Sequence, residues 1–374
     1  MKQHNFNLLL TVLFCLFIGG MFLGSILLPD RTFSQLENRN LAAAPKLSWE
    51  TVTTGTFMED AEDYVNDQII GRDFWVALKA WSERVSGKQE NNGVYFAKED
   101  TLISRVDTPS QSDLEENAGY VNALVNNVDV PVYFGIIPSA AEIWSYRLPE
   151  GAPTADEKAI IDRLYNEVQT HVIDLYSVLN AHKDEELYYR TDHHWTSLGA
   201  YYGYTALMDA MGLEAVPLDE SQKVTVSEDF YGTLFSSSGV RWLPPDHIDR
   251  YISDEGVTVT AYPNGTPEPG SLYVDSYLEV KDKYSSFLGG NKPLCVIETE
   301  HTDAPKVLVI RDSYADSLAP FLTQNFSEIH LFDPRYNLTS VKDYVTQNEI
   351  DSVVVLYSIS NFTAKDNQMF VLGR

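Results

Sequence analysis

The chain has 374 residues, 44% of them hydrophobic and 22% charged, which is ordinary for a globular protein with one large domain or two small ones. Its formal net charge of −27 argues against nucleic acid as a partner, and against docking on anionic lipid through the soluble part, because like charges repel. Only two cysteines occur, Cys15 and Cys295, and Cys15 lies in an apolar N-terminal stretch, so we expect no intrachain disulfide. The cysteines form no zinc-binding motif, and we expect no metal and no cofactor.

An apolar stretch without any charge occupies residues 8–28. A helix needs about 20 apolar residues to cross a bilayer, so this stretch is long enough. A cleaved signal peptide is the alternative, although no small-X-small site directly follows residue 28. Lys2 and the amino terminus favour a cytoplasmic N-terminus. We therefore expect residues 1–30 to be a membrane anchor or signal segment. The protein would then be a single-pass protein of the cell membrane, with the bulk of its chain outside the cytoplasm.

Residues 31–90 are expected to form a linker and a helical N-terminal region. Apolar and aromatic side chains recur at helical spacing from 52 to 85, with a break at Gly71. The rest of the chain, residues 91–374, begins with a predicted hairpin at 93–103, a helix at 114–126 and a buried strand at 130–138. Alternating strands and helices indicate parallel βαβ units, so we predict an α/β fold with a mainly parallel sheet between helices.

The most distinctive stretch is residues 188–200, which combines an acid, two adjacent histidines and a Thr/Ser pair on a predicted strand-to-helix turn. In Asp192-X-His194, a carboxylate can hold the imidazole Nδ1–H, leaving Nε2 to act as a general base. A polar turn with a helix N-cap is one alternative. A metal site is another, since His and Asp are metal ligands, but no third ligand follows at helical spacing.

A nucleophile is predicted far downstream, where a buried strand at 306–310 ends in Arg311-Asp312-Ser313 and a helix follows. A serine at a strand's carboxyl end is well placed to attack a carbonyl, and its backbone N–H can hold the oxyanion. The alternative role of Ser313 is a helix N-cap, which is compatible with the first. Ser317 is a weaker candidate because it falls one turn inside the helix. Between the two motifs, about 213–300, the chain is rich in Gly, Pro and Tyr, so we expect an inserted small β-rich region over the site.

Three further residues are candidates for substrate binding. Arg335 follows a predicted strand end, where ligands of open α/β sheets bind, and it can hold a carboxylate or steady negative charge. A salt bridge to Asp333 or Asp312 explains Arg335 equally well. Tyr314 can stack on a sugar, although a place in the core is its more ordinary role. His193 is expected to contact substrate rather than to act as the base.

The block Thr-Asp-His-His-Trp-Thr at 191–196 resembles the signature of the DHHW family. That family is similar to AlgX/AlgJ-type proteins of bacterial exopolysaccharide O-acetylation, which belong with the SGNH hydrolases. Looser matches cover most of the chain after the first thirty residues, at 33–41, 66–73, 231–234, 288–291 and 333–336. One departure is Arg311, at a position where related blocks have Gly, which affects the expected oxyanion hole.

The resemblance implies an SGNH-like fold and a triad of Ser313, His194 and Asp192. It also implies acyl transfer to an exported polysaccharide, with a membrane-bound O-acyltransferase as the partner that supplies acyl groups. An acetylesterase with the same triad is the first alternative. The second is a non-catalytic polysaccharide-binding or assembly protein, because Arg311 is unusual.

Overall fold

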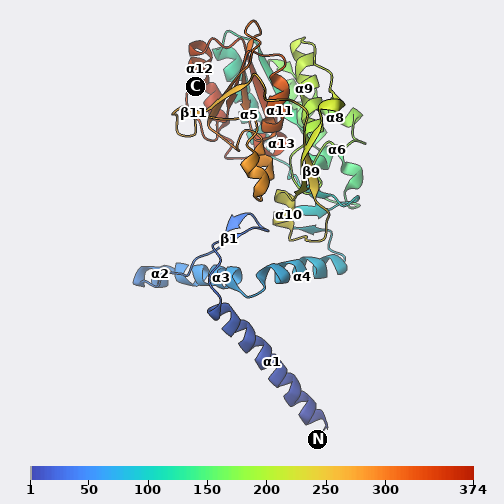
Figure 1. Ribbon diagram of the computed structural model, residues 1–374, viewed down its shortest axis with the longest axis vertical. Coiled ribbons are helices and arrows are strands. Elements are labelled where there is room, and N and C mark those ends of the chain that lie inside the picture. The colour runs from blue at the N-terminus through green and yellow to red at the C-terminus, as the bar shows by residue number, and fades with distance from the viewer. Residues whose placement is uncertain (1) are drawn as a thin grey trace. The chain divides into compact units, whose positions relative to one another are not determined.

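The computed structural model describes residues 2–374. Two compact units make up the chain (Figure 1). The first contains Met1–Lys88 and Ser236–Trp242, and the second contains Gln89–Phe235 and Leu243–Arg374. The second unit holds the central sheet and all the residues singled out for chemistry.

The first unit is mainly helical. Within the described residues, its apolar N-terminal helix contains no buried residue, and Gln3–Leu27 is the one helix long and apolar enough to cross a membrane, a property that signal sequences share. Ion pairs join two of the segments that carry the family resemblance, because Asp67 contacts both Arg39, at 2.5 Å, and Arg72, at 3.3 Å. The elements are α1 Lys2–Leu27, β1 Phe33–Ser34, β2 Arg39–Asn40, α2 Trp49–Thr54, α3 Thr56–Gln68 and α4 Arg72–Val85.

An eight-stranded sheet forms the centre of the second unit, in the order β11-β10-β12-β14-β13-β15-β6-β7. The five strands from β14 to β7 are parallel, while β12, β10 and β11 add antiparallel pairs at one side. The strands are β6 Val132–Ile137, β7 His171–Val172, β10 Thr258–Ala261, β11 Glu268–Pro269, β12 Leu294–Glu298, β13 Lys306–Arg311, β14 Glu328–Phe332 and β15 Ser352–Ser358.

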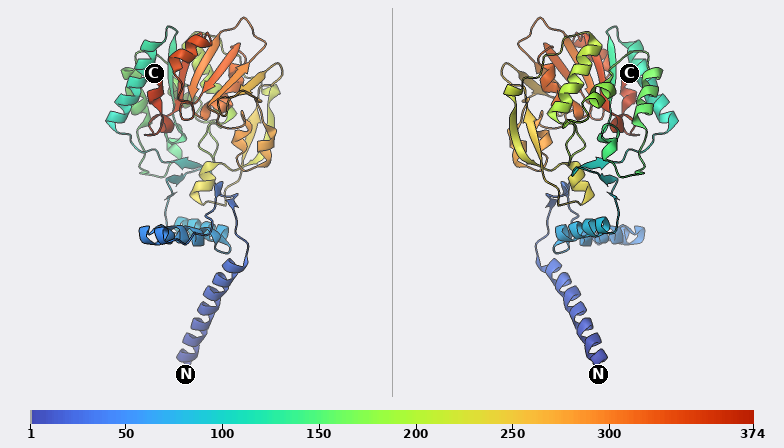
Figure 2. Two further views of the ribbon diagram at one scale, coloured as in Figure 1. Left: turned by 90° about the vertical axis from the view of Figure 1, so that its left-hand side faces the viewer. Right: turned by 90° about the vertical axis from the view of Figure 1, so that its right-hand side faces the viewer.

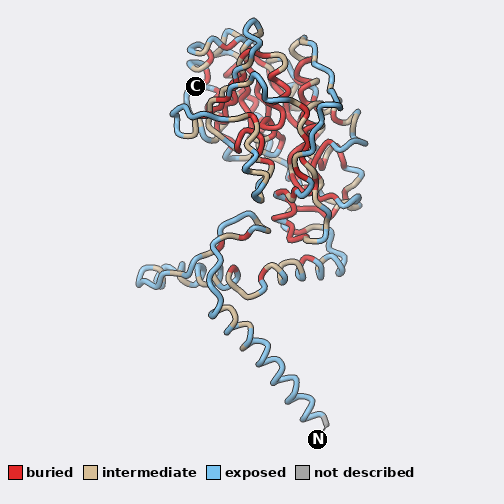
Figure 3. Tube along the Cα trace, viewed as in Figure 1, coloured by how far each residue is buried: buried red, intermediate tan, exposed pale blue. Residues whose placement is uncertain are grey.

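Helices lie on both sides of this sheet (Figure 2). One group contains α8, α9 and α11, and the other contains α5, α7 and α12. Because both faces are covered, β13 and β15 are buried almost throughout and are nearly continuous runs of Val, Leu and Ile (Figure 3). These helices are α5 Gln111–Asn127, α7 Glu157–Glu167, α8 Leu175–Ala181, α9 Ser197–Met211, α11 Tyr314–Leu322 and α12 Val341–Gln347.

Smaller elements surround this frame. A three-stranded sheet contains the expected hairpin, and a two-stranded sheet, β8 with β9, comes from the predicted β-rich region, which also supplies β10 to β12. The predicted α/β fold is confirmed by the mainly parallel central sheet and the helices on both its sides (Figure 2). The remaining elements are β3 Glu90–Asn91, β4 Val94–Phe96, β5 Leu102–Ser104, β8 Val224–Phe230, β9 Asp246–Arg250, α6 Ala140–Ile143, α10 Thr233–Ser238, α13 Ile359–Phe362, and the short 3-10 helices η1 Ser145–Arg147, η2 Glu220–Gln222, η3 Asp275–Glu279, η4 Lys283–Ser286 and η5 Met369–Gly373.

Candidate active site

The two motifs meet at the carboxyl end of β13. The 188–196 segment closes a loop through a bridge between Tyr188 and Trp195, so that the intervening acid and histidines project from one turn. The Trp195 indole N–H donates to the carbonyl oxygen of Tyr314 at 2.9 Å and to Ser317 Oγ at 3.0 Å. Trp195 is fully buried, so the tryptophan of the motif joins this loop to the start of α11.

Asp192, His194 and Ser313 form one hydrogen-bonded chain. Asp192 Oδ1 lies 2.6 Å from His194 Nδ1, and Ser313 Oγ lies 2.8 Å from His194 Nε2. A carboxylate beside Nδ1 places the proton on that nitrogen, so Nε2 can accept the hydrogen bond that the serine hydroxyl donates. Ser313 is partly exposed while the other two are buried. Ser313 is therefore the member of this chain that a substrate can reach.

The carboxylate is held by donors from the 231–234 segment. The Thr233 backbone N–H donates to Asp192 Oδ2 at 2.6 Å, and the Thr233 hydroxyl lies 3.0 Å from the same oxygen. Burial acts to raise the pKa of Asp192, but the charges of His193 and His194 and the hydrogen bonds outweigh it and hold this pKa well below its usual range. Asp192 therefore stays ionised beside the imidazole.

Gly232 allows the backbone to approach Asp192 closely. A Cβ at this position would lie 2.2 Å from both Cβ and Oδ2 of Asp192, which is far inside van der Waals contact. We expect Gly232→Ala to displace the carboxylate and lower turnover by about 10², the loss that a displacement of about 1 Å can cause. The measurement is turnover of an acetyl ester. Gly119→Ala is the control, because a Cβ there meets nothing within 4 Å, and equal activity of the two variants would contradict the prediction.

Tyr284 covers the imidazole from η4. Its ring stacks on that of His194, with centroids 3.8 Å apart and planes 9° from parallel. Its hydroxyl donates to the carbonyl oxygen of Ser313 at 2.9 Å and lies 3.0 Å from Ser317 Oγ. Burial raises the pKa of Tyr284, so the hydroxyl remains a donor. Tyr284 therefore limits rotation of the His194 ring and ties it to the backbone of Ser313.

Asp312 organises the turn before the nucleophile. One of its carboxylate oxygens accepts the Tyr314 N–H at 3.1 Å. The other accepts the N–H and the hydroxyl of Ser358 at 3.0 and 2.6 Å, and the amide of Asn361 at 2.8 Å. The Tyr314 N–H is thus occupied, whereas within the described residues the Ser313 N–H has no acceptor. Of these two N–H groups, the one of Ser313 remains for an oxyanion.

Arg311, the departure from related blocks, points into the protein. It is fully buried and pairs with Asp316 at 2.9 Å. Burial raises the pKa of Asp316 to about 6, although Arg311 opposes that rise. A weaker contact joins Arg311 to the Asn291 oxygen at 3.3 Å. The guanidinium therefore lies under the turn that carries Ser313 and makes no contact with solvent.

The three predicted substrate-binding residues lie in three different surroundings. His193 has 37% of its side chain exposed, with Nδ1 2.7 Å from the Thr233 hydroxyl. Desolvation and the adjacent His194 lower the pKa of His193 to about 4, although the charge of Asp192 opposes this lowering. Arg335 is paired with Asp333 through two bonds of 2.9 and 2.6 Å, and Tyr314 is 3% exposed, with its hydroxyl donating to the His193 carbonyl oxygen. Of the three, His193 has the most exposed side chain, at 37%, against 22% for Arg335.

The metal alternative has a geometric basis here. Asp192, His193 and His194 offer ligand atoms that all lie within 4.8 Å of one another. However, Asp192 Oδ2 already accepts a backbone N–H, and both nitrogens of His194 are engaged in the chain to Ser313. A cation would have to displace these donors, so the arrangement favours a hydrogen-bonded base over a metal ligand set.

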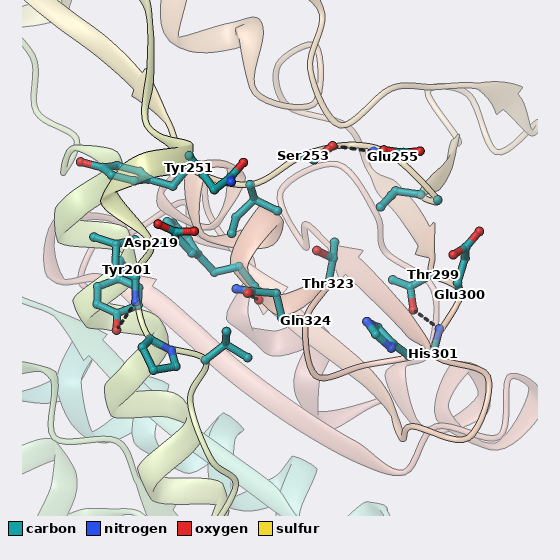
Figure 4. Close-up of a pocket in the computed structure, with 18 residues that line it drawn as sticks. Tyr201, Asp219, Tyr251, Ser253, Glu255, Thr299, Glu300, His301, Thr323 and Gln324 are labelled. Carbon is teal, nitrogen blue, oxygen red and sulfur yellow. Dashed lines mark hydrogen bonds between the residues drawn. The ribbon is translucent and has the colours of Figure 1, made fainter.

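A large pocket lies away from this site. Its volume is about 460 Å³, and it is lined by Thr323 and Gln324, which follow the C-terminal end of α11, and by Thr299 and His301, which follow β12 (Figure 4). Ser313 stands at the opposite end of α11. The pocket therefore lies at the amino ends of the parallel strands, whereas Ser313 lies at their carboxyl ends. The hydrogen-bonded chain from Asp192 to Ser313 does not use this pocket.

Comparisons with known proteins agree with the fold. A model of the DHHW protein family matches residues 108–332, which is more than half of the chain. The chain is similar to the solved structure of a DHHW family protein from Eubacterium siraeum DSM 15702, with 27% identity, a TM-score of 0.66, and coverage of 75% of this chain and 95% of that chain. It is also similar to Bacillus cereus PatB1 with a sulfonyl adduct, with 20% identity, a TM-score of 0.62, and coverage of 74% and 98%.

A more distant likeness is to the O-acetyltransferase domain of Pseudomonas putida AlgJ, with 15% identity, a TM-score of 0.47, and coverage of 73% of this chain and 93% of that chain. A search of curated proteins finds no match.

Proposed function

Because this chain belongs to the DHHW family, we propose that it is a membrane-anchored acyl transfer enzyme that O-acetylates a cell-surface or exported polysaccharide. The observation that carries the proposal is the hydrogen-bonded chain from Asp192 through His194 to Ser313, with bonds of 2.6 and 2.8 Å and a partly exposed serine. That arrangement suits a serine nucleophile with its general base and an orienting acid.

The chemistry follows from the positions of the protons. Ser313 Oγ attacks the acetyl carbonyl of a donor ester while His194 Nε2 takes the hydroxyl proton. The donor's C–O bond then breaks, and the leaving oxygen takes the proton from Nε2, which leaves an acetyl group on Ser313. A sugar hydroxyl next attacks this ester and gives its proton to Nε2, and Ser313 leaves with that proton. Asp192 stabilises the imidazolium in both halves.

The acceptor decides between the two enzyme functions. If water replaces the sugar hydroxyl, the same residues make the chain an acetylesterase. The test is to supply an acetyl-ester chromogen to the full chain with and without an oligosaccharide, and to weigh the sugar products. Acetylated sugar supports the transferase, and acetate alone supports the esterase. Ester cleavage no faster than in buffer, and no acetylated sugar, would contradict both and favour the binding or assembly protein.

The placement in the cell is part of the proposal. We propose that α1 anchors the chain in the membrane with the second unit outside the cytoplasm, where a membrane-bound O-acyltransferase would supply acyl groups. The support is that this helix is apolar, uncharged between residues 8 and 28, and without a buried residue among those described.

Protease added to intact cells with a permeable wall is therefore expected to digest the chain after residue 28. A tag placed before residue 2 serves as the control and should survive until the membrane is dissolved. Full protection of the chain, or release of a soluble mature form into the medium, would contradict the anchor.

A further inference from the structure

A second pocket lies at the same edge of the sheet as the nucleophile. Leu294 pairs with Phe332, and Phe332 pairs with Ile310, so these three residues form one row across β12, β14 and β13. Ser313 is three residues beyond Ile310, and the pocket is lined by Leu294 and by the segment that follows Phe332. Neighbouring strands are about 4.8 Å apart, so Leu294 lies about 10 Å across the sheet from β13. The pocket is therefore a near neighbour of the site along the catalytic edge.

Aromatic and apolar side chains form much of the pocket, whose volume is about 690 Å³. Tyr336 and Leu338, both in the segment after β14, are 56% and 52% exposed. Tyr262 faces them from the turn after β10, and Tyr344 contributes from α12, labelled in Figure 1. A tyrosine offers a flat apolar face with a polar tip, which matches the apolar face and hydroxyl rim of a sugar ring.

The polar groups of the pocket are amides. Asn264, Asn337 and Gln347 line it, and each amide offers both donor and acceptor atoms. The Asn337 oxygen accepts the N–H and hydroxyl of Thr339 at 3.1 and 2.7 Å, which fixes the side chain and leaves its NH₂ group as a donor. Amides at fixed positions on an apolar wall give a binding site its orientation, and hydroxyl groups are suitable partners for them.

The charge of the pocket restricts its ligand. Among the described residues that line it, none is Lys, Arg or His, and Asp343 is the only charged one. The nearby Arg335 is held by both oxygens of Asp333. The Arg335 guanidinium lies 5.5 Å from the centroid of the Tyr336 ring, but its charge is already paired with Asp333. A uronate or phosphate group would find no unpaired counter-charge among the lining residues and would meet Asp343 on a chain of net charge −27. The pocket therefore favours an uncharged sugar.

We propose that this pocket binds an uncharged sugar residue of the acceptor glycan, close to the residue whose hydroxyl receives the acetyl group. The proposal rests on the proposed function and narrows its substrate to a neutral polysaccharide. Tyr336 provides the stacking surface, and Asn337 helps to orient the ring through its hydroxyl groups.

The test is calorimetric titration of the full chain with three pentasaccharides, in a detergent without a sugar headgroup. The probes are cellopentaose and chitopentaose, which are neutral, and pentagalacturonate, which is acidic. The protein carries Ser313→Ala, so that no turnover occurs during the titration. We expect at least one neutral probe to bind and Tyr336→Ala to raise its Kd by about tenfold or more. The matched control is Tyr146→Ala, an exposed tyrosine in η1 that does not line the pocket, which should leave the Kd unchanged.

The proposal is overturned if neither neutral probe binds, if pentagalacturonate binds as well as they do, or if Tyr336→Ala leaves the Kd unchanged. An equal loss of affinity in Tyr146→Ala would mean that the pocket does not account for binding, and it would overturn the proposal too. A failure here is separable from a failure of the proposed function, because acetylation of Ser313 by a donor ester is measured on the unsubstituted chain without any glycan.

Discussion

Replacing Ser313 by alanine is expected to lower turnover of an acetyl ester by about 10⁶, the loss typical for a triad nucleophile. The hydroxyl is the attacking group, and it lies 2.8 Å from the base, so no neighbouring oxygen can take its place without moving the backbone. The measurement is the rate of cleavage of an acetyl-ester chromogen by the purified full chain. A variant that keeps a tenth or more of the original activity would rule out Ser313.

Ser317→Ala is the matched control for this variant. Ser317 lies one turn further along α11 and is buried against Trp195 and Tyr284, with bonds of 3.0 Å to each. We expect it to cost about 1–2 kcal/mol of stability through the lost hydrogen bonds, while most of the activity remains. Thermal unfolding of both variants separates a lost nucleophile from a lost fold.

The two adjacent histidines are expected to differ sharply. His194→Ala should fall close to the activity of Ser313→Ala, because His194 alone bonds both Asp192 and the serine. His193→Ala should keep measurable turnover, with its main loss in substrate affinity, because its Nδ1 faces the Thr233 hydroxyl and its ring is partly exposed. Turnover and KM of both variants on the same acetyl ester make the comparison.

A double variant gives the control for this pair. His194→Ala combined with Ser313→Ala should be no slower than either alone, since residues that act as a unit are not additive. A dead His193→Ala with an active His194→Ala would reverse the assignment. That result would also mean that the contact between Asp192 and His194 is not the one used in catalysis.

Local patterns in the sequence are enough to predict several parts of the fold and of the candidate site. The apolar run of β13 indicates a strand covered on both faces, which is how it lies. The spacing of Asp192 and His194 predicts that both can lie on one side of a turn, and their side chains are 2.6 Å apart. A serine after a buried strand predicts a position at the sheet's edge, where Ser313 stands. Each of these inferences needs only neighbouring residues.

Other parts depend on pairings that no local pattern encodes. Asp312 is held by Ser358 and Asn361 because β13 and β15 are parallel neighbours, and that register follows only from the whole fold. Tyr284 reaches His194 from a short 3-10 helix inside a region without clear periodicity. Thr233 lies in 231–234, which is among the segments that resemble the family, so the sequence pointed to this segment. The hydrogen bond from Thr233 to Asp192 could not be predicted from sequence.

The sequence alone leaves the role of Arg335 open between two possibilities. A ligand contact and an ion pair with Asp333 or Asp312 were equally consistent with its position after a strand. The structure pairs it with Asp333, because the two residues share one tight turn and the Arg335 N–H also donates to that carboxylate at 3.1 Å. The binding surface that we propose instead begins one residue later, at Tyr336.

Intact mass spectrometry of the full chain after exposure to an acetyl-ester donor tests the central claim most directly. We expect the protein to gain one acetyl group, which peptide mapping locates on Ser313, and we expect no gain in Ser313→Ala. The gain should disappear when an acceptor is added, because the acetyl group passes on. A chain that cleaves the ester without ever carrying an acetyl group, or that carries it on another residue, would contradict a covalent mechanism through Ser313.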